Sequence, residues 1–135
     1  MPWFADASVL LAGVDASDRE HGAAGSLLGG AALIATLDLA YYEVTNVAVR
    51  AWRDPAAARE LRGLVSAIAQ DGGLVRVDGA LAADAAELAE QHGLSAYDAA
   101  YVAGAAASGA RLVSCDVRDL VRPGLALTPG QAVVA

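Results

Sequence analysis

Apolar residues in this chain fall into short runs that alternate with longer stretches of helical periodicity. Short apolar runs bounded by turn residues are typical of buried strands, and they occur at residues 2–6, 31–36, 74–77 and 111–116. Residues 125–129 allow a short fifth strand. The helical stretches cover residues 38–52, 54–70, 80–93 and 95–109. Strands that alternate with helices indicate a parallel sheet covered on both faces. We therefore expect one domain, residues 1–135, with three α/β/α layers and a mostly parallel sheet of four or five strands.

The stretch from residue 38 to residue 52 has apolar residues on two sides of the predicted helix. Its core stripe is formed by Leu37, Ala40, Val44, Val47 and Ala51. Tyr42 and Val49 lie opposite that stripe. An exposed apolar surface of this kind usually marks a protein interface, which here favours a homodimer or another protein partner. The alternative is that the helix at 54–70 covers the same side.

Charge, the length of apolar runs and cysteine content limit the kinds of protein that this chain can be. The chain has 135 residues, a formal net charge of −7 and no lysine, so its 9 basic residues are all arginines. This excess of acidic residues argues against nucleic-acid binding through a broad, positively charged surface. Its apolar runs are shorter than the ~18 residues that a membrane helix needs. The single cysteine, Cys115, cannot form an internal disulfide, and the start MPWFAD lacks the features of a secretory signal. We expect a cytoplasmic protein that does not bind membranes.

Several common kinds of active site are excluded by residue types. One cysteine with His21 and His92 far apart gives no zinc-binding spacing. The glycines of residues 21–30 match neither a dinucleotide fingerprint nor a P-loop, and the P-loop also requires a lysine. No nucleophile-elbow motif supports catalysis through a covalent serine.

Carboxylates are placed where chemistry is expected in a parallel sheet. Asp6 and Asp116 follow predicted strands, and ligands of open parallel sheets gather outside the carboxyl ends of the strands. Either residue can instead simply cap the helix that follows it. Asp98 falls three residues after Ser95 in a capping-box pattern, which also leaves Asp98 in the first turn of its helix.

Glu43 lies in the middle of a predicted helix, where capping is not available to it. It flanks the core stripe, with Asn46 and Arg50 on the same side. The alternative to a functional role is an edge glutamate that reaches water or pairs with Arg50, worth about 1 kcal/mol or less. If Asp6, Glu43, Asp98 and Asp116 converge, they repel one another unless a cation compensates. Mg²⁺ or Mn²⁺, as one ion or two, suits such oxygen ligands and activates water for attack on a phosphodiester.

Three stretches resemble the motifs of the PIN domain family, and specifically its VapC-type toxins from bacterial toxin–antitoxin pairs. FADASVLLAG resembles the first-strand motif with a metal-binding aspartate, here Asp6. YYEVTNV resembles the motif with a catalytic glutamate followed by an asparagine, here Glu43 and Asn46. LSAYDAAYVAGAAASGARLVSCD resembles the block that carries the third and fourth acids, here Asp98 and Asp116.

The resemblance implies a Mg²⁺- or Mn²⁺-dependent endoribonuclease in which these four acids bind metal and position the attacking water. It implies two partners, an RNA substrate and a VapB-like antitoxin protein that blocks the site. The sequence departs from the family pattern because Ala7 replaces a frequent threonine, and Ser114 with Cys115 replaces Thr-x before the fourth acid. Hydroxyls remain near the proposed site, and the supporting candidates are Ser8, Asn46, Ser114 and Asp119.

Four arginines are candidates for contact with RNA, namely Arg50, Arg53, Arg111 and Arg118. The alternative for each is a solvated surface charge, and for Asp119 a solvated helix residue. Two other functions keep the same fold: a PIN-like nuclease of RNA processing without toxicity, and a catalytically inactive module that binds RNA or protein.

Overall fold

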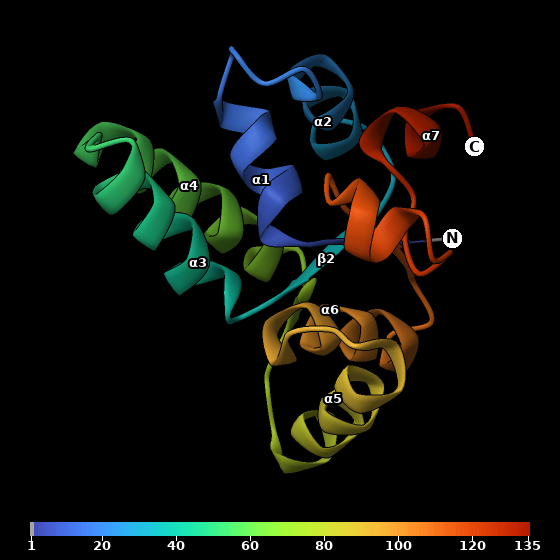
Figure 1. Cartoon of the computed structure of the whole chain (residues 1–135). Helices are drawn as coiled ribbons and strands as arrows, with labels where there is room; N and C mark the ends of the chain where they lie inside the picture. Colours follow the sequence, from blue (N-terminus) through green and yellow to red (C-terminus); the bar gives the residue numbers. More distant parts are fainter. Residues whose placement is uncertain (1) are drawn as a thin grey trace.

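The computed structural model describes residues 2–135 and has the expected three layers, with helices on both faces of a parallel sheet (Figure 1). The four strands are β1 (Trp3–Ala5), β2 (Ile34–Leu37), β3 (Leu74–Val75) and β4 (Arg111–Val113). They lie in the order β3-β2-β1-β4, and every pairing is parallel. All four carboxyl ends therefore face the same edge of the sheet.

Strand β1 occupies the interior of the sheet and pairs with a neighbour on each side. Phe4 lies opposite Ala35 of β2 and Leu112 of β4. The Thr36 hydroxyl adds a hydrogen bond of 2.7 Å to the carbonyl oxygen of Ala5. The end of β1, from which the chain enters its first helix, is thus fixed by both neighbouring strands.

The possible fifth strand at residues 125–129 is reduced to one bridge, between Leu127 and Val113. Thr128 then starts helix α7 (Pro129–Val133), since its side chain and that of Gln131 form a reciprocal capping box. Proline at the first helical position also favours this helix. Local capping therefore ends the pairing after a single residue.

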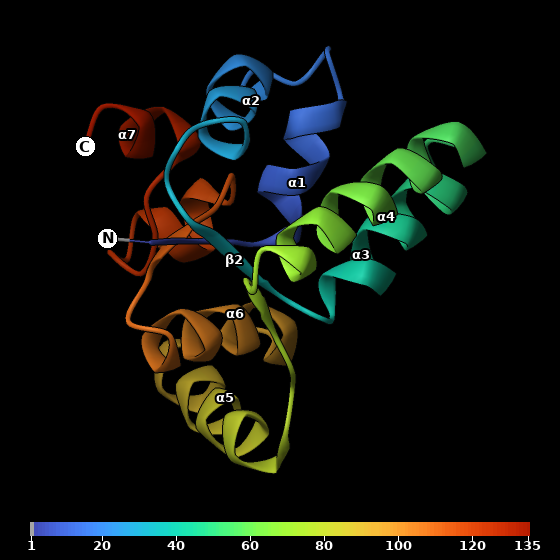
Figure 2. The same ribbon diagram turned by 180° about the vertical axis from the view of Figure 1, so that it is seen from behind.

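One face of the sheet is covered by α1 (Ala7–Val14), α3 (Ala40–Asn46) and α4 (Pro55–Gln70), as Figure 2 shows from behind. Helix α2 (His21–Leu28) packs on α1 and α7. The buried side chains of this layer include Val9, Leu10, Val44, Leu61 and Val65. Asp54 caps α4 by accepting the N–H of Ala57, which places the start of this helix where the Asp-Pro pair predicted it.

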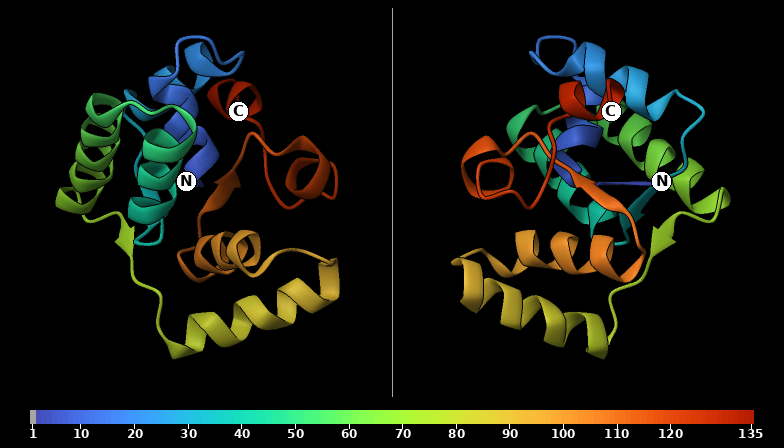
Figure 3. Two further views of the ribbon diagram at one scale, coloured as in Figure 1. Left: turned by 60° about the vertical axis from the view of Figure 1, so that its left-hand side comes forward. Right: turned by 90° about the vertical axis from the view of Figure 1, so that its right-hand side faces the viewer.

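The other face is covered by α6 (Ala96–Ala107), with α5 (Gly79–His92) packed on its outer side (Figure 3). Phe4, Leu37, Tyr101 and Leu112 are buried in this layer. Gly104 lets α6 approach closely, because a Cβ atom there would lie 2.7 Å from the Phe4 ring and 3.0 Å from Leu37. Helix α6 is therefore held directly against β1 and β2.

The helix expected at residues 38–52 changes its hydrogen bonding halfway along. After α3 the chain continues as η1 (Val47–Ala51), a π-helical turn in which the N–H of Trp52 donates to the carbonyl of Val47. The buried residues are Ala40, Val44 and Ala48. The predicted stripe was therefore wrong beyond Val44, because five-residue bonding rotates later side chains away from the 3.6-residue pattern.

The apolar side of this helix stays exposed, as Tyr42 and Val49 are 79% and 50% accessible. Helix α4 packs on α3 but does not cover these two residues. The alternative that α4 hides them is therefore wrong. Between residues 2 and 135, no helix is long and apolar enough to cross a membrane.

Candidate active site

Asp6, Glu43, Asp98 and Asp116 line a single pocket of about 290 Å³ at the carboxyl ends of the strands. Four distant parts of the chain supply them: the ends of β1 and β4, and helices α3 and α6. The parallel sheet brings the first two together, and the helices packed on its opposite faces contribute the other two. The predicted convergence of these carboxylates is present in the structure, and their chemical roles stay predictions.

Asp6 and Asp116 each cap a helix and face the pocket at the same time. Asp6 is buried and accepts the N–H of Val9 in the first turn of α1 at 3.3 Å. Asp116 accepts the N–H of Asp119 at 3.0 Å and so begins η2 (Val117–Val121). A capping oxygen leaves the second carboxylate oxygen free for another ligand. Capping and a site role are therefore compatible at both positions.

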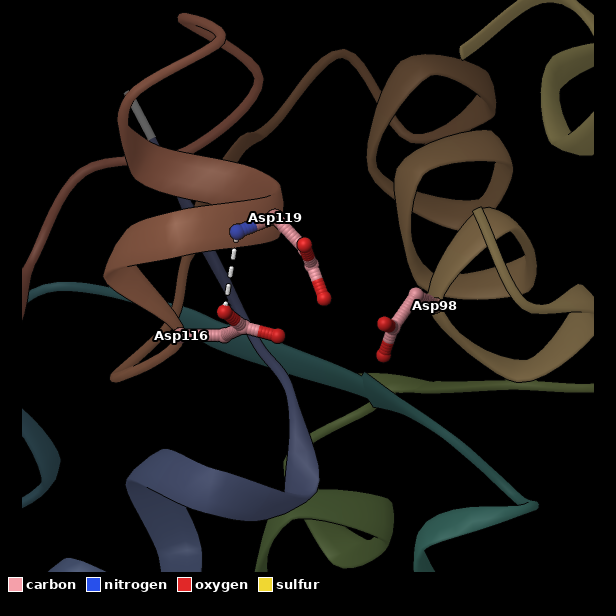
Figure 4. A group of neighbouring side chains, drawn as sticks. All are labelled: Asp98, Asp116 and Asp119. Carbon is pink, nitrogen blue, oxygen red and sulfur yellow. Dashed lines mark hydrogen bonds between the residues drawn. The ribbon is translucent and has the colours of Figure 1, made fainter. Parts of the chain in front are cut away.

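Asp98 points from the first turn of α6 towards Asp116 and Asp119, as Figure 4 shows. One carboxylate oxygen from each of these three residues lies within 4.8 Å of the others. Ser95 caps α6 and accepts the N–H of Asp98 at 3.1 Å, so the predicted cap is present beside the cluster. Asp119 therefore belongs to the acidic cluster in space, although it was expected only as a supporting residue.

Glu43 does not pair with Arg50, the basic residue on the same side of its helix. Within residues 2–135 the only ion pair joins Arg118 and Asp119, so the alternative pairing of Glu43 with Arg50 is not formed. Instead, the Tyr101 hydroxyl donates to Oε1 of Glu43 at 2.6 Å. Sequence reasoning missed Tyr101. Its spacing of three residues after Asp98, which places both on one side of α6, was the available signal.

Serine hydroxyls connect the ends of β1 and β4. The Ser8 hydroxyl donates to Oδ1 of Asp6 at 2.5 Å and accepts the N–H of Cys115 at 2.9 Å. Ser114, which is fully buried, accepts the N–H of Asp116 at 3.0 Å. Cys115 is half-buried, and burial raises the pKa of its thiol to about 12, so its sulfur has no thiolate character near neutral pH.

Three carboxylates of the pocket have raised pKa values. Burial raises the pKa of Asp6 to about 6, although the hydroxyls of Ser114 and Ser8 oppose the rise. Burial also raises the pKa of Glu43 and of Asp98, and for Asp98 the charges of Asp116 and Asp119 add to the effect. Burial and neighbouring like charges disfavour the ionised form of these carboxylates. A hard divalent cation, which prefers oxygen ligands, would stabilise that form.

The PIN domain family model matches residues 4–123, which include all of these carboxylates. The chain belongs to the PIN domain family. Comparison with curated proteins of known function gave no match.

Several solved structures are similar to this chain in fold. The chain is similar to a toxin–antitoxin complex from Klebsiella pneumoniae, with 18% identity, a TM-score of 0.71 and coverage of 96% of this chain and 98% of that one. It is also similar to Mycobacterium tuberculosis VapC20, a toxin that cleaves the sarcin-ricin loop, with 19% identity, a TM-score of 0.69 and coverage of 90% and 95%. For PAE2754 from Pyrobaculum aerophilum, identity is 24%, the TM-score is 0.76, and coverage is 99% and 88%.

The asparagine and arginines predicted to support the site or bind RNA differ in where they lie relative to the pocket of this PIN domain. Asn46 is exposed and lines the pocket, and Arg50 lines a neighbouring hollow with Glu43 and Asn46. Arg118 is exposed and pairs with Asp119. Arg53 is exposed after η1. Arg111 lies at the first position of β4, at the opposite edge of the sheet from the site. The structure therefore brings Arg50 and Arg118 near the acids, but not Arg111.

A separate apolar groove of about 750 Å³ runs between α3 and the α5–α6 pair of this PIN domain. Tyr42 and Tyr97, which are 79% and 61% exposed, lie along it. Each of these tyrosines directly precedes a carboxylate of the pocket, Glu43 or Asp98. The groove and the acidic pocket therefore lie side by side.

Proposed function

We propose that this PIN domain is a metal-dependent endoribonuclease that acts as the toxin of a toxin–antitoxin pair. The observation that carries the proposal is the convergence of Asp6, Glu43, Asp98 and Asp116 on one pocket. Membership of the PIN domain family supports the same activity. The similarity in fold to VapC20 and to the Klebsiella pneumoniae toxin–antitoxin complex supports the toxin role.

The donor set fits Mg²⁺ or Mn²⁺, as one ion or two. Asp6, Glu43, Asp98 and Asp116 would hold the cation, and Asp119 lies close enough to Asp98 and Asp116 to support it. When bound, such an ion lowers the pKa of a coordinated water and stabilises negative charge on the leaving oxygen. Ser8 and Ser114 hold the carboxylate of Asp6 and the backbone of Asp116 in place. In the proposed active form, metal binding keeps the acids ionised despite their burial.

RNA would approach from the side of α3 and η1. Asn46 lines the pocket with an amide that can donate to a phosphate oxygen, and Arg50 lies in the adjoining hollow. An overall charge of −7 leaves these local donors and the bound cation to attract the phosphate backbone. Because the proposed substrate is cellular RNA, we expect the protein to act in the cytoplasm.

A cognate VapB-like antitoxin is the proposed protein partner, together with a second copy of the chain. Exposed Tyr42, Val49 and Tyr97 form an apolar surface beside the acidic pocket. A protein bound there would lie close enough to control access to the acids. The toxin–antitoxin complex among the similar structures supports an antitoxin partner.

The test is cleavage of total cellular RNA by purified, partner-free protein with Mg²⁺ or Mn²⁺ and with chelator. The Asp98→Asn variant should lose cleavage by at least about 100-fold, because it removes a charged ligand of the cluster. Asp84→Asn, the same change on the exposed outer helix α5, should retain activity. Attack by water should leave no 2′,3′-cyclic phosphate ends, and cyclic ends that disappear with Asp98→Asn would contradict hydrolysis by an activated water.

Absence of metal-dependent cleavage on a broad RNA panel by folded protein would favour the alternative of a binding module. A growth assay separates the toxin from an RNA-processing nuclease. Induced expression of a toxin should arrest growth, the Asp98→Asn variant should not, and co-expression of a neighbouring small reading frame should restore growth. Cleavage without growth arrest would favour the processing nuclease.

A further inference from the structure

The hydroxyl of Tyr101 is placed to control one carboxylate of the pocket. Tyr101 is 2% exposed, and its hydroxyl donates to Oε1 of Glu43 at 2.6 Å, across the space between α6 and α3. Both residues line the acidic pocket. Among residues 2–135, Oε2 of Glu43 has no hydrogen-bond partner, so the bond engages one oxygen and leaves the other available.

The tyrosine ring is fixed by the sheet beneath it. The Phe4 and Tyr101 rings meet edge to face, with centroids 6.5 Å apart and an interplanar angle of 72°. Gly104, one turn further along α6, lets the helix approach β1 closely. A donor held this rigidly restricts the rotamers of a glutamate that would otherwise sample several positions from the middle of a helix.

Tyr101 also couples two acids that come from different elements. It lies three residues after Asp98 on α6, while its hydroxyl holds Glu43 on α3. The bond therefore sets the position of Glu43 relative to the helix that carries Asp98. No basic side chain performs this task, since the one ion pair among the described residues joins Arg118 and Asp119.

We propose that Tyr101 is a positioning residue, whose hydroxyl holds the Glu43 carboxylate in the orientation needed to bind a divalent cation. This inference rests on the proposed metal-dependent function. Partners that orient a metal-binding carboxylate typically change metal affinity by about 10- to 100-fold when they are removed. A structural tyrosine that merely needs an acceptor for its hydroxyl would change stability and leave metal affinity unchanged.

The test is Mn²⁺ binding to metal-free protein, measured from the loss of the free-ion signal in electron paramagnetic resonance. Tyr101→Phe removes only the hydroxyl and should weaken Mn²⁺ binding by about 10-fold or more. Tyr41→Phe is the matched control, since it removes a hydroxyl that contacts Ser66 at 2.9 Å, and it should leave Mn²⁺ affinity unchanged. Equal affinity of Tyr101→Phe and wild type, with wild type binding Mn²⁺, overturns this inference alone.

A double-mutant cycle shows whether Tyr101 acts through Glu43. In a Glu43→Gln background, Tyr101→Phe should change Mn²⁺ affinity by less than about 3-fold, which is about half or less of its free-energy effect in the wild type. Fully additive effects would contradict the proposal. Wild-type protein that binds no Mn²⁺ would overturn the metal site and the inference with it.

A measurement that keeps Tyr101 in place covers the case in which Tyr101→Phe does not fold. Wild-type protein labelled with 3-fluorotyrosine carries four fluorines, at Tyr41, Tyr42, Tyr97 and Tyr101. Single Tyr→Phe variants at the other three positions assign the Tyr101 resonance by elimination. Addition of Mg²⁺ should shift this resonance in the wild type but not in Glu43→Gln. The same shift in both proteins would overturn the proposal.

Discussion

The hydroxyl oxygens of Ser8 and Ser114 lie 3.5 Å apart, although the two residues are separated by 106 positions in the chain. Ser8 follows β1 and donates to Asp6, while Ser114 follows β4 and accepts the N–H of Asp116. The pair therefore links the two strand ends that present carboxylates. Ser114 thus keeps a hydroxyl at the position where the resemblance led us to expect threonine.

Ser114→Ala should weaken Mn²⁺ affinity by about 10-fold, because the N–H of Asp116 loses its acceptor and the carboxylate loses its orientation. The Ser114 hydroxyl also lowers the pKa of Asp6, so its loss makes ionisation of that acid harder. Titration of metal-free protein with Mn²⁺ measures the effect. Ser66→Ala removes a hydroxyl remote from the pocket and serves as the control. Equal affinities for both variants would contradict this role.

Asp6→Asn should stabilise the metal-free protein at pH 7. The pKa of Asp6 is raised from 3.8 to about 6 in the fold, so the folded protein holds a proton more tightly than the unfolded chain does. Stability contributed by this group is present below pH 3.8 and is lost as pH rises to about 6, by roughly 3 kcal/mol. The asparagine variant avoids that loss.

Chemical denaturation of both proteins between pH 4 and pH 7.5, with chelator present, measures this difference. The advantage of Asp6→Asn over wild type should grow as pH rises and level off above pH 6. Asp84→Asn on the exposed face of α5 should show no such trend. A constant difference across the range would mean that burial does not disfavour ionised Asp6.

Gly104→Ala and Gly63→Ala should affect stability differently, although both glycines lie inside helices. A Cβ at Gly63 meets nothing within 4 Å, and alanine there should add up to about 1 kcal/mol through helix propensity. A Cβ at Gly104 would approach the Phe4 ring to 2.7 Å. We expect Gly104→Ala to be about 1–3 kcal/mol less stable than Gly63→Ala. Equal unfolding free energies would show that α6 can move away from the sheet.

Tyr42→Asp should disrupt self-association of the partner-free protein. Tyr42 is 79% exposed on the apolar side of α3, and a buried unpaired carboxylate at an interface is costly. Sedimentation should show a dimer for the wild type and at least 10-fold weaker association for the variant. Val134→Asp introduces the same charge at another exposed position, of 82% accessibility, and should remain dimeric. A monomeric wild type would contradict the homodimer prediction.

Local signals in the sequence predicted most of the elements. Asp54 and Ser95 each cap the helix that follows them, and Gly93 ends α5 in the left-handed conformation, at φ 66°. Such contacts span three or four residues and need no knowledge of the fold. Helix α2, the π-helical turn at Val47–Ala51 and helix α7 were not predicted. The π-helical turn departs from the periodicity of apolar residues, whereas α7 was missed although Thr128 and Gln131 form a local capping box.

By itself, the sequence determined the three-layer class, the parallel sheet and the placement of Asp6 and Asp116 after strands, because periodicity, caps and strand ends are local properties of the chain. Only the tertiary structure decided that Glu43 is bonded to Tyr101 rather than paired with Arg50, and that Asp119 lies beside Asp98. It also decided that Arg111 lies at the opposite edge of the sheet. The physical reason is that these relationships depend on how elements distant in sequence pack across both faces of the sheet, and a one-dimensional pattern carries no such distances.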